Sequence, residues 1–192
     1  MTTDLSQSGI AQLAPLSVGK NYDRAAQRSK VLIDDLYKRL GALAKSINHI
    51  GGTAVPRHIG RPTIDLLLIT PDLYEFDQHS AELEARGYRR VGDGGLVGQR
   101  LFSLGQGIHC EAQLYVYEPG DLAAVHHLLL RDYLRTHPAD AYSYGELKSR
   151  LATTYMTNSA AYLAAKRPRL ERLLQLAKGR SPEPYGGTHR TP

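Results

Sequence analysis

A glycine turn followed by an acid in an apolar segment is the part of the sequence best suited to chemistry. Gly51 and Gly52 allow a sharp turn that can present backbone N–H groups to a phosphate, and the Thr53 hydroxyl can add one more donor. Asp65 lies inside the nearly continuous apolar run 63–70, where a carboxylate is costly to bury unless it meets a metal ion, a cation or hydrogen-bond donors. The pattern fits a phosphate site, and it also fits a plain turn followed by an acid at a strand edge.

The elements that must position this stretch alternate between helix and strand. Leucines at helical spacing predict a helix over residues 29–44. Residues 46–50 alternate between apolar and polar, which predicts a strand, and the apolar run 63–70 predicts a buried central strand. A helical stretch then begins at Pro71 and ends at Gly87. Asp65 is therefore expected on an inner strand, directly after the glycine turn.

Further strands and then helices complete the pattern. Three strands are predicted, over residues 88–91, 99–104 and 108–117. Asp121 is a candidate N-cap for a helix that ends before Pro138. Two more helices are predicted, over residues 139–154 and 159–178. Pro168 is expected to kink or restart the second of these. This order predicts an α+β fold: a mixed β-sheet flanked by helices, with a helical C-terminal portion.

Length and composition fit one domain with a substantial core. The chain has 192 residues, of which 42% are hydrophobic. Residues 1–20 and 179–192 lack apolar periodicity and are rich in small and polar residues, so both are expected to be flexible. The domain is accordingly expected over residues 21–178.

Charge and cysteine content limit the partners. A net charge of +5 and a pI near 9.3 favour anionic partners, although a mild excess of this kind can serve solubility alone. The single cysteine, Cys110, excludes an internal disulfide and a cysteine-rich metal site. The sequence has no apolar stretch near the roughly 20 residues needed to cross a bilayer, and it begins with polar residues. A cytoplasmic location with no membrane partner is the expectation.

Two long motifs, in the same order, resemble the GrpB family of the nucleotidyltransferase superfamily. The first covers residues 49–65, and the second begins at residue 130 and continues to residue 152. Matches near Tyr22 and over residues 162–166 extend the resemblance from about residue 22 to residue 176. The resemblance implies a nucleotidyltransferase-like fold whose core sheet carries the glycine turn. It also implies transfer of a nucleotidyl group to an acceptor, supported by Mg²⁺.

The chain departs from the superfamily pattern at the metal-binding acids. Nucleotidyltransferases carry two acids two residues apart on the strand after the glycine turn, where both can hold divalent metal ions. Here Asp65 is present and Leu67 stands at the partner position. On the later strand, Gln113 and Tyr115 replace the family's His-x-His pair. By strand alternation Glu111 shares their face, so it is a second candidate metal ligand with Asp65, or else a solvated edge residue.

Basic residues of the C-terminal half also match family positions. These are Arg131, Lys148 and Lys166, with Tyr133 beside the first. Arginine offers a planar fork for phosphate oxygens, and lysine a compact charge. If their helices fold back over the sheet, they would surround Asp65; alternatively, they make contacts along the helix surfaces. His49, at the end of a strand, is expected to hydrogen-bond the turn rather than substrate.

These observations lead to two functional hypotheses. In the first, the chain is a nucleotidyltransferase-like enzyme in which Asp65 is catalytic and binds Mg²⁺. In the second, it is a catalytically eroded module that binds a nucleotide or another phosphorylated small molecule. Leu67, Gln113 and Tyr115 favour the second hypothesis. A nucleic-acid partner rests on net charge alone and is the least favoured of the three interpretations.

Overall fold

The computed structural model describes residues 17–18, 22–57, 59–92, 98–156 and 158–179. Its strands are β1 (Ser17–Val18), β2 (Ser46–Ile50), β3 (Ile59–Gly60), β4 (Ile64–Ile69), β5 (Tyr88–Gly92), β6 (Arg100–Leu104) and β7 (Ala112–Tyr117). Its α-helices are α1 (Tyr22–Leu40), α2 (Leu73–Gln78), α3 (Ser80–Glu84), α4 (Leu122–Thr136), α5 (Pro138–Thr154) and α6 (Ser159–Lys178). Short 3₁₀ turns lie at Gly41–Leu43, Gly52–Ala54 and Gly107–His109.

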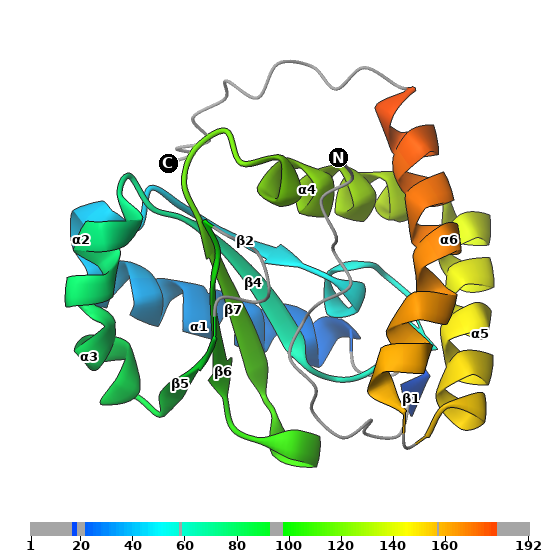
Figure 1. The fold of residues 1–192 in the computed structure, drawn as a ribbon, viewed down its shortest axis with the longest axis horizontal. Coiled ribbons are helices and arrows are strands. Elements are labelled where there is room, and N and C mark those ends of the chain that lie inside the picture. Colours follow the sequence, from blue (N-terminus) through cyan, green and yellow to red (C-terminus); the bar gives the residue numbers. More distant parts are fainter. Residues whose placement is uncertain (1–16, 19–21, 58, 93–97, 157, 180–192) are drawn as a thin grey trace.

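Five strands form the main sheet in the order β2-β4-β7-β6-β5 (Figure 1). The inner strands β4 and β7 run parallel, and the other neighbours are antiparallel. The parallel pair explains why β4 is almost continuously apolar, since parallel strands are covered on both faces. β1 and β3 form a separate antiparallel pair. The expected α+β fold with a mixed sheet is therefore confirmed.

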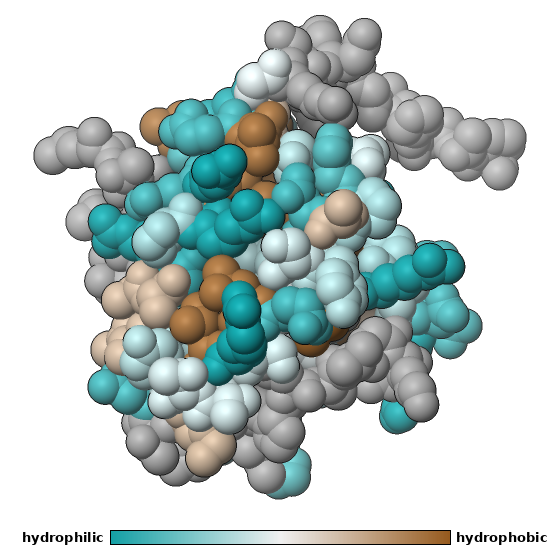
Figure 2. All heavy atoms as spheres, turned by 90° about the vertical axis from the view of Figure 1, so that its right-hand side faces the viewer, coloured by the Kyte–Doolittle hydropathy of each residue, from teal (hydrophilic) through white to brown (hydrophobic). Residues whose placement is uncertain are grey.

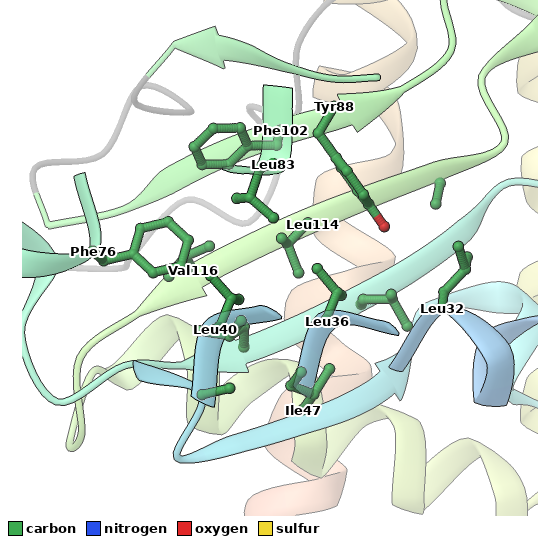
Figure 3. Packing of buried hydrophobic residues seen from close by; sticks show 14 of the residues in the cluster. Leu32, Leu36, Leu40, Ile47, Phe76, Leu83, Tyr88, Phe102, Leu114 and Val116 are labelled. Atoms are coloured by element: carbon green, nitrogen blue, oxygen red, sulfur yellow. The ribbon is translucent and has the colours of Figure 1, made fainter. Parts of the chain in front are cut away.

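One face of the sheet packs against α1 to form the main hydrophobic core (Figure 3). Leu32, Leu36 and Leu40 recur at helical spacing and form a buried stripe along α1. They pack in one cluster with Leu66 of β4 and Leu114 of β7. Burial of this stripe explains why α1 lies flat across the sheet.

The opposite face packs against α4 and the helices that follow it. Leu67 of β4, Tyr115 and Tyr117 of β7, and the α4 residues Ala123 and Ala124 form a second buried cluster. A third cluster joins α4, α5 and α6 through Leu134, Tyr144 and Leu173, among others. Figure 1 shows α5 and α6 side by side at one end of the sheet. The predicted helical C-terminal portion is therefore present and is tied to the sheet by α4.

Several predicted boundaries differ from the structure. The helical stretch 71–87 is two short helices, because the helix that Asp72 caps ends at Gln78 and a new helix begins at Ser80. The strand predicted over 108–117 begins only at Ala112, after the 3₁₀ turn Gly107–His109. Pro168 lies within a helix that runs without interruption over α6. Asp121 caps α4 as expected and accepts bonds from the backbone N–H groups of residues 123 and 124.

The predicted terminal segments lie largely outside the described residues. Of the segment 1–20, only Ser17–Val18 is described, and it forms β1 rather than an irregular chain. Of the segment 179–192, only Gly179 is described, and its backbone N–H donates to the Gln175 carbonyl. None of the described helices is long and apolar enough to span a membrane.

Candidate functional site

The glycine turn places its backbone directly against Asp65. β2 ends at Ile50, whose register partner on β4 is Asp65, so the next residue, Gly51, lies beside the carboxylate. Gly51 has a φ of 69°, a conformation that L-residues other than glycine rarely adopt. A β-carbon on Gly51 would overlap Oδ2 of Asp65. Position 51 therefore requires glycine for two separate reasons, conformation and close approach.

Within the turn, the predicted donor Thr53 makes contacts inside the protein. Its hydroxyl lies 2.9 Å from Nε2 of His49 and donates to the Thr63 carbonyl at 3.3 Å. Burial lowers the pKa of His49 to about 4, with a further contribution from Arg135 and Arg131, so the ring is neutral at pH 7. The expectation that His49 bonds to the turn is confirmed. The hydroxyl of Thr53 holds the turn together, and Gly52 begins the 3₁₀ turn 52–54.

Lys148 reaches the neighbourhood of Asp65 because one face of α5 packs on β3. Ala141, Tyr144 and Gly145 form the buried stripe of α5, and Lys148 continues it one turn later. A β-carbon on Gly145 would lie 2.7 Å from the β-carbon of Ile59, so the helix and β3 are in close contact. The ammonium of Lys148 lies 5.0 Å from the centroid of the Tyr144 ring, within the range of a cation–π interaction.

Lys166 occupies the equivalent position on α6. It follows the buried Tyr162 by one turn, and its ammonium lies 5.6 Å from the centroid of that ring. The buried stripe of α6 continues beyond it through Leu170 and Leu173. Two neighbouring helices therefore each present a lysine from a buried stripe, supported by a tyrosine four residues earlier. Seen from the side of α5 and α6, most of the described surface is hydrophilic (Figure 2).

Electrostatic interactions link these lysines to one partly buried carboxylate. Burial raises the pKa of Asp65 to about 6, while nearby Arg61, Lys166 and Lys148 act to lower it. Burial also lowers the pKa of Lys148 to about 7, and the positive charges of Lys166 and Arg61 lower it further, against the opposing effect of Asp65. Arg61 lies just after β3, on which α5 packs. Arg61, Asp65, Lys148 and Lys166 are called the Asp65 cluster below.

The Asp65 cluster does not provide the donor set of a resident divalent metal ion. Mg²⁺ is held by oxygen ligands, typically one or two carboxylates together with substrate phosphates. The neighbour of Asp65 on its own strand face, Leu67, is apolar and fully buried. Among the described residues, no group of three or more His, Cys, Asp or Glu side chains could hold a metal ion. Three cationic side chains near Asp65 fit an added anion better than a further cation.

Glu111, the other predicted metal ligand, is bonded elsewhere. Its carboxylate accepts from Nε of Arg28 on α1 at 2.5 Å and from Nη2 at 3.2 Å. The prediction assumed that the strand extends back to Glu111. Because β7 begins at Ala112, strand alternation does not apply to Glu111. The structure therefore brings Glu111 to α1 and not to Asp65.

Arg131 and Tyr133 connect parts of the protein to one another. The guanidinium of Arg131 is buried; it donates to both carboxylate oxygens of Asp132, at 2.7 and 3.1 Å, and to the His49 carbonyl at 3.2 Å. The Tyr133 hydroxyl donates to Asp140 at 2.6 Å. These contacts fasten α4 to the end of β2 and to α5. Of the predicted site residues, Gly51, Lys148 and Lys166 therefore lie with Asp65, whereas Glu111, Arg131 and Tyr133 make contacts elsewhere.

Comparison with protein families agrees with this architecture. The family model described as GrpB protein matches residues 17–176. The chain belongs to the GrpB family.

Among curated relatives of this GrpB-family chain, YqkA of Bacillus subtilis is 36% identical over 121 residues. The match covers 63% of this chain and 35% of YqkA. PA4798 of Pseudomonas aeruginosa is 35% identical over 147 residues, which covers 75% of this chain and 61% of PA4798. The chain therefore spans less than two thirds of the length of each of these two relatives.

Solved structures show the same fold. The crystal structure of GrpB from Enterococcus faecalis is similar with a TM-score of 0.71 and 26% identity, covering 84% of this chain and 98% of that one. The poly(U) polymerase Cid1, solved in complex with the UTP analogue UMPNPP, is similar with a TM-score of 0.51 and 16% identity. That match covers 78% of this chain and 48% of Cid1. The GrpB-family chain therefore has a nucleotidyltransferase-like fold.

Sequence reasoning gave no role to one member of the Asp65 cluster. Arg61 lies in the first motif, four residues before Asp65, yet within that motif only Gly51, Gly52 and Thr53 are predicted to bind a phosphate. The sequence signal that indicates a role for Arg61 is its position, since it is a basic residue just before an apolar strand that contains an acid. Cys110 also lies near this cluster, since Asp65 acts to raise and Arg61 to lower its pKa, after burial as the main cause of a raised value.

Proposed function

We propose that this GrpB-family protein binds a phosphate-bearing small molecule, such as a nucleotide, at the Asp65 cluster. The observation that carries the proposal is the convergence of Arg61, Lys148 and Lys166 on one partly buried carboxylate. They come from three separate parts of the fold: the segment after β3, α5 and α6. A phosphate group carries the negative charge that arginine and lysine side chains recognise.

The cluster combines three cationic side chains and one carboxylate in a partly buried place. Burial, together with repulsion from Lys166 and Arg61, lowers the pKa of Lys148 to about 7. An anion bound beside Lys148 would raise that pKa again, so binding near pH 8 should be accompanied by proton uptake. This coupling is a specific consequence of a phosphate at the cluster, and it can be measured as a buffer-dependent heat of binding.

A first experiment is a thermal-shift screen with ATP, UTP and pyrophosphate, each with and without Mg²⁺. The proposal predicts stabilisation by the anions without Mg²⁺, and its loss in Lys166→Met. The matched control is Lys30→Met, which removes the same charge from an exposed position on α1. An equal shift in both variants would show that binding occurs elsewhere, and no shift with any of the ligands would refute the proposal.

Nucleotidyl transfer is the second candidate function, supported by the nucleotidyltransferase-like fold and by Asp65 on the strand after the glycine turn. The replacement of its partner acid by Leu67 and the pairing of Glu111 with Arg28 make it less favoured. Transfer requires Mg²⁺-dependent incorporation of label from a nucleoside triphosphate, abolished in Asp65→Asn. Incorporation of that kind would establish transfer and show that binding is only its first step.

A further inference from the structure

The parallel strands β4 and β7 place two polar side chains next to each other. Asp65 and Gln113 are register partners on these strands, which lie roughly 4.8 Å apart, so both side chains leave the same face of the sheet (Figure 1). It is the face that α4 covers, since Leu67 and Tyr115, each two residues further along, belong to the cluster that includes α4 residues. Leu67 and Tyr115 are buried, whereas Asp65 and Gln113 are partly exposed. The polar pair therefore lies next to the part of the face that α4 closes.

The side-chain amide of Gln113 is held in one orientation. The Tyr115 hydroxyl donates to Oε1 of Gln113 at 2.8 Å. The Tyr115 ring is itself buried, and its centroid lies 5.3 Å from that of the His127 ring on α4. Because the amide oxygen accepts from Tyr115, the NH2 group is the part of the amide that remains to donate. Gln113 therefore presents a hydrogen-bond donor that a residue of the core keeps in place.

The carboxylate of Asp65 presents acceptors beside this donor. On the β2 side it lies against Gly51, which has no side chain to donate to it. Within the part of the chain that the structure describes, no hydrogen bond joins this carboxylate to another residue, and the Gln113 amide has only its bond to Tyr115. An acceptor and a donor placed side by side fit a ligand group that both donates and accepts, as a hydroxyl does.

We infer that Asp65 and Gln113 bind the sugar hydroxyl groups of a ribonucleotide whose phosphates lie at the cations of the Asp65 cluster. This inference rests on the proposed function, which places the phosphates, and it names the class of ligand. The sugar hydroxyls donate to the carboxylate of Asp65 and accept from the amide of Gln113, and Tyr115 is a positioning residue. The contact also gives a role to a carboxylate within an anion site, because a hydroxyl donates well to an ionised oxygen.

The test is a calorimetric titration of the full chain at pH 7, without Mg²⁺, with ATP, dideoxy-ATP and pyrophosphate. Dideoxy-ATP keeps the base and the triphosphate but lacks both sugar hydroxyls, and pyrophosphate keeps only phosphate groups. Wild type should bind ATP about tenfold more tightly than dideoxy-ATP, because a site that hydrogen-bonds a hydroxyl rejects the analogue without it. In Gln113→Leu the affinity for ATP should fall to that for dideoxy-ATP, while the affinity for pyrophosphate stays within about twofold.

Two further variants separate recognition of the hydroxyls from stability. Tyr115→Phe keeps the buried ring and removes the hydroxyl that orients the amide, so the preference for ATP over dideoxy-ATP should fall severalfold. A purely structural role of Tyr115 would change the affinities for all three ligands alike. The matched control is Gln27→Leu, the same replacement at an exposed position on α1, on the other side of the sheet. This control should keep the full preference.

Two results would overturn the inference. One is equal affinity of wild type for ATP and dideoxy-ATP; the other is a preference for ATP that neither Gln113→Leu nor Tyr115→Phe lowers. The same titrations separate this inference from the proposed function. If all three ligands bind and the sugar hydroxyls make no difference, only the sugar contact fails, whereas absence of binding by all three refutes the proposed site and the inference together.

Discussion

The two faces of the sheet differ in the direction in which the surroundings shift the pKa of an aspartate. On the side of α1, Asp35 accepts hydrogen bonds from Arg86 and Arg39, and these bonds lower its pKa to about 2. On the side of α4, Asp65 has three cations nearby, yet burial raises its pKa to about 6. The carboxylate of Asp35 is therefore stabilised by its partners, and that of Asp65 is destabilised by its surroundings.

This difference indicates what each face contributes. The α1 face combines a closed hydrophobic core with ion pairs at its edge, an arrangement that serves stability. The other face keeps partly buried charges whose pKa values are shifted toward neutrality, an arrangement common at functional sites. We therefore expect substitutions on the α1 face to alter stability alone, and substitutions in the Asp65 cluster to alter binding.

The largest expected effect is on the α1 face, at Phe102. Its ring is fully buried and meets the Phe76 ring edge-on, with centroids 6.0 Å apart. Phe102→Ala should lower the free energy of unfolding by about 3–5 kcal/mol through lost burial and an unfilled cavity. Urea unfolding measures this loss. ATP affinity of the folded variant at low temperature should stay within about twofold, and a larger change would break the proposed division between the faces.

An intermediate effect is expected at Arg131. This residue lies on α4, which covers the same sheet face as Asp65, but its guanidinium donates hydrogen bonds to other residues of the protein. Arg131→Ala leaves the His49 carbonyl and Asp132 without its guanidinium, so the free energy of unfolding should fall by about 1–3 kcal/mol. Calorimetric unfolding measures the change. Loss of ATP binding without loss of stability would instead assign Arg131 to the ligand, as the family resemblance predicts.

The smallest expected effect is the pH dependence of stability, whose sign distinguishes the two aspartates. Asp65 has its pKa raised to about 6, so between about pH 4 and 6 the unfolded chain releases a proton that the folded chain keeps. The free energy of unfolding should therefore fall as pH rises through this window, by on the order of 2 kcal/mol, and Asp65→Asn should remove the slope.

Asp35 provides the matched control. Its lowered pKa contributes stability above about pH 4 that is lost as pH falls toward 2. Asp35→Asn should therefore remove a slope of the opposite sign. Urea unfolding from pH 2.5 to 7.5 in wild type and both variants measures the two slopes. Equal slopes in wild type and Asp65→Asn would show that Asp65 titrates normally.

Local patterns predicted the elements that carry the site better than they predicted its contacts. The apolar run around Asp65 identified β4, and the strand that ends at Ile50 was located correctly. Glu111 was misplaced because alternation holds only within a strand, and the strand begins one residue later. Arg61 was missed because its proximity to Lys148 depends on α5 packing against β3, a long-range contact that no local pattern specifies.

The Lys148 and Lys166 positions could have been inferred from helical spacing as well as from the family resemblance. Each lysine follows a tyrosine by four residues on a helix whose same face is otherwise apolar. A lysine on such a stripe departs from amphipathic patterning, as an acid within an apolar strand does. Either departure indicates a candidate functional residue.

The most direct test of the phosphate site compares two variants that lose the same charge. One is the triple variant Arg61→Gln, Lys148→Met and Lys166→Met, and the other is Lys30→Met, Lys38→Met and Lys45→Met on the exposed surface. Calorimetric titration with ATP at pH 7 and constant ionic strength should show binding to wild type and to the surface variant within about threefold, and a loss of at least about a hundredfold in the cluster variant. Equal affinity in the two triple variants, or a loss confined to the surface variant, would contradict a phosphate site at Asp65.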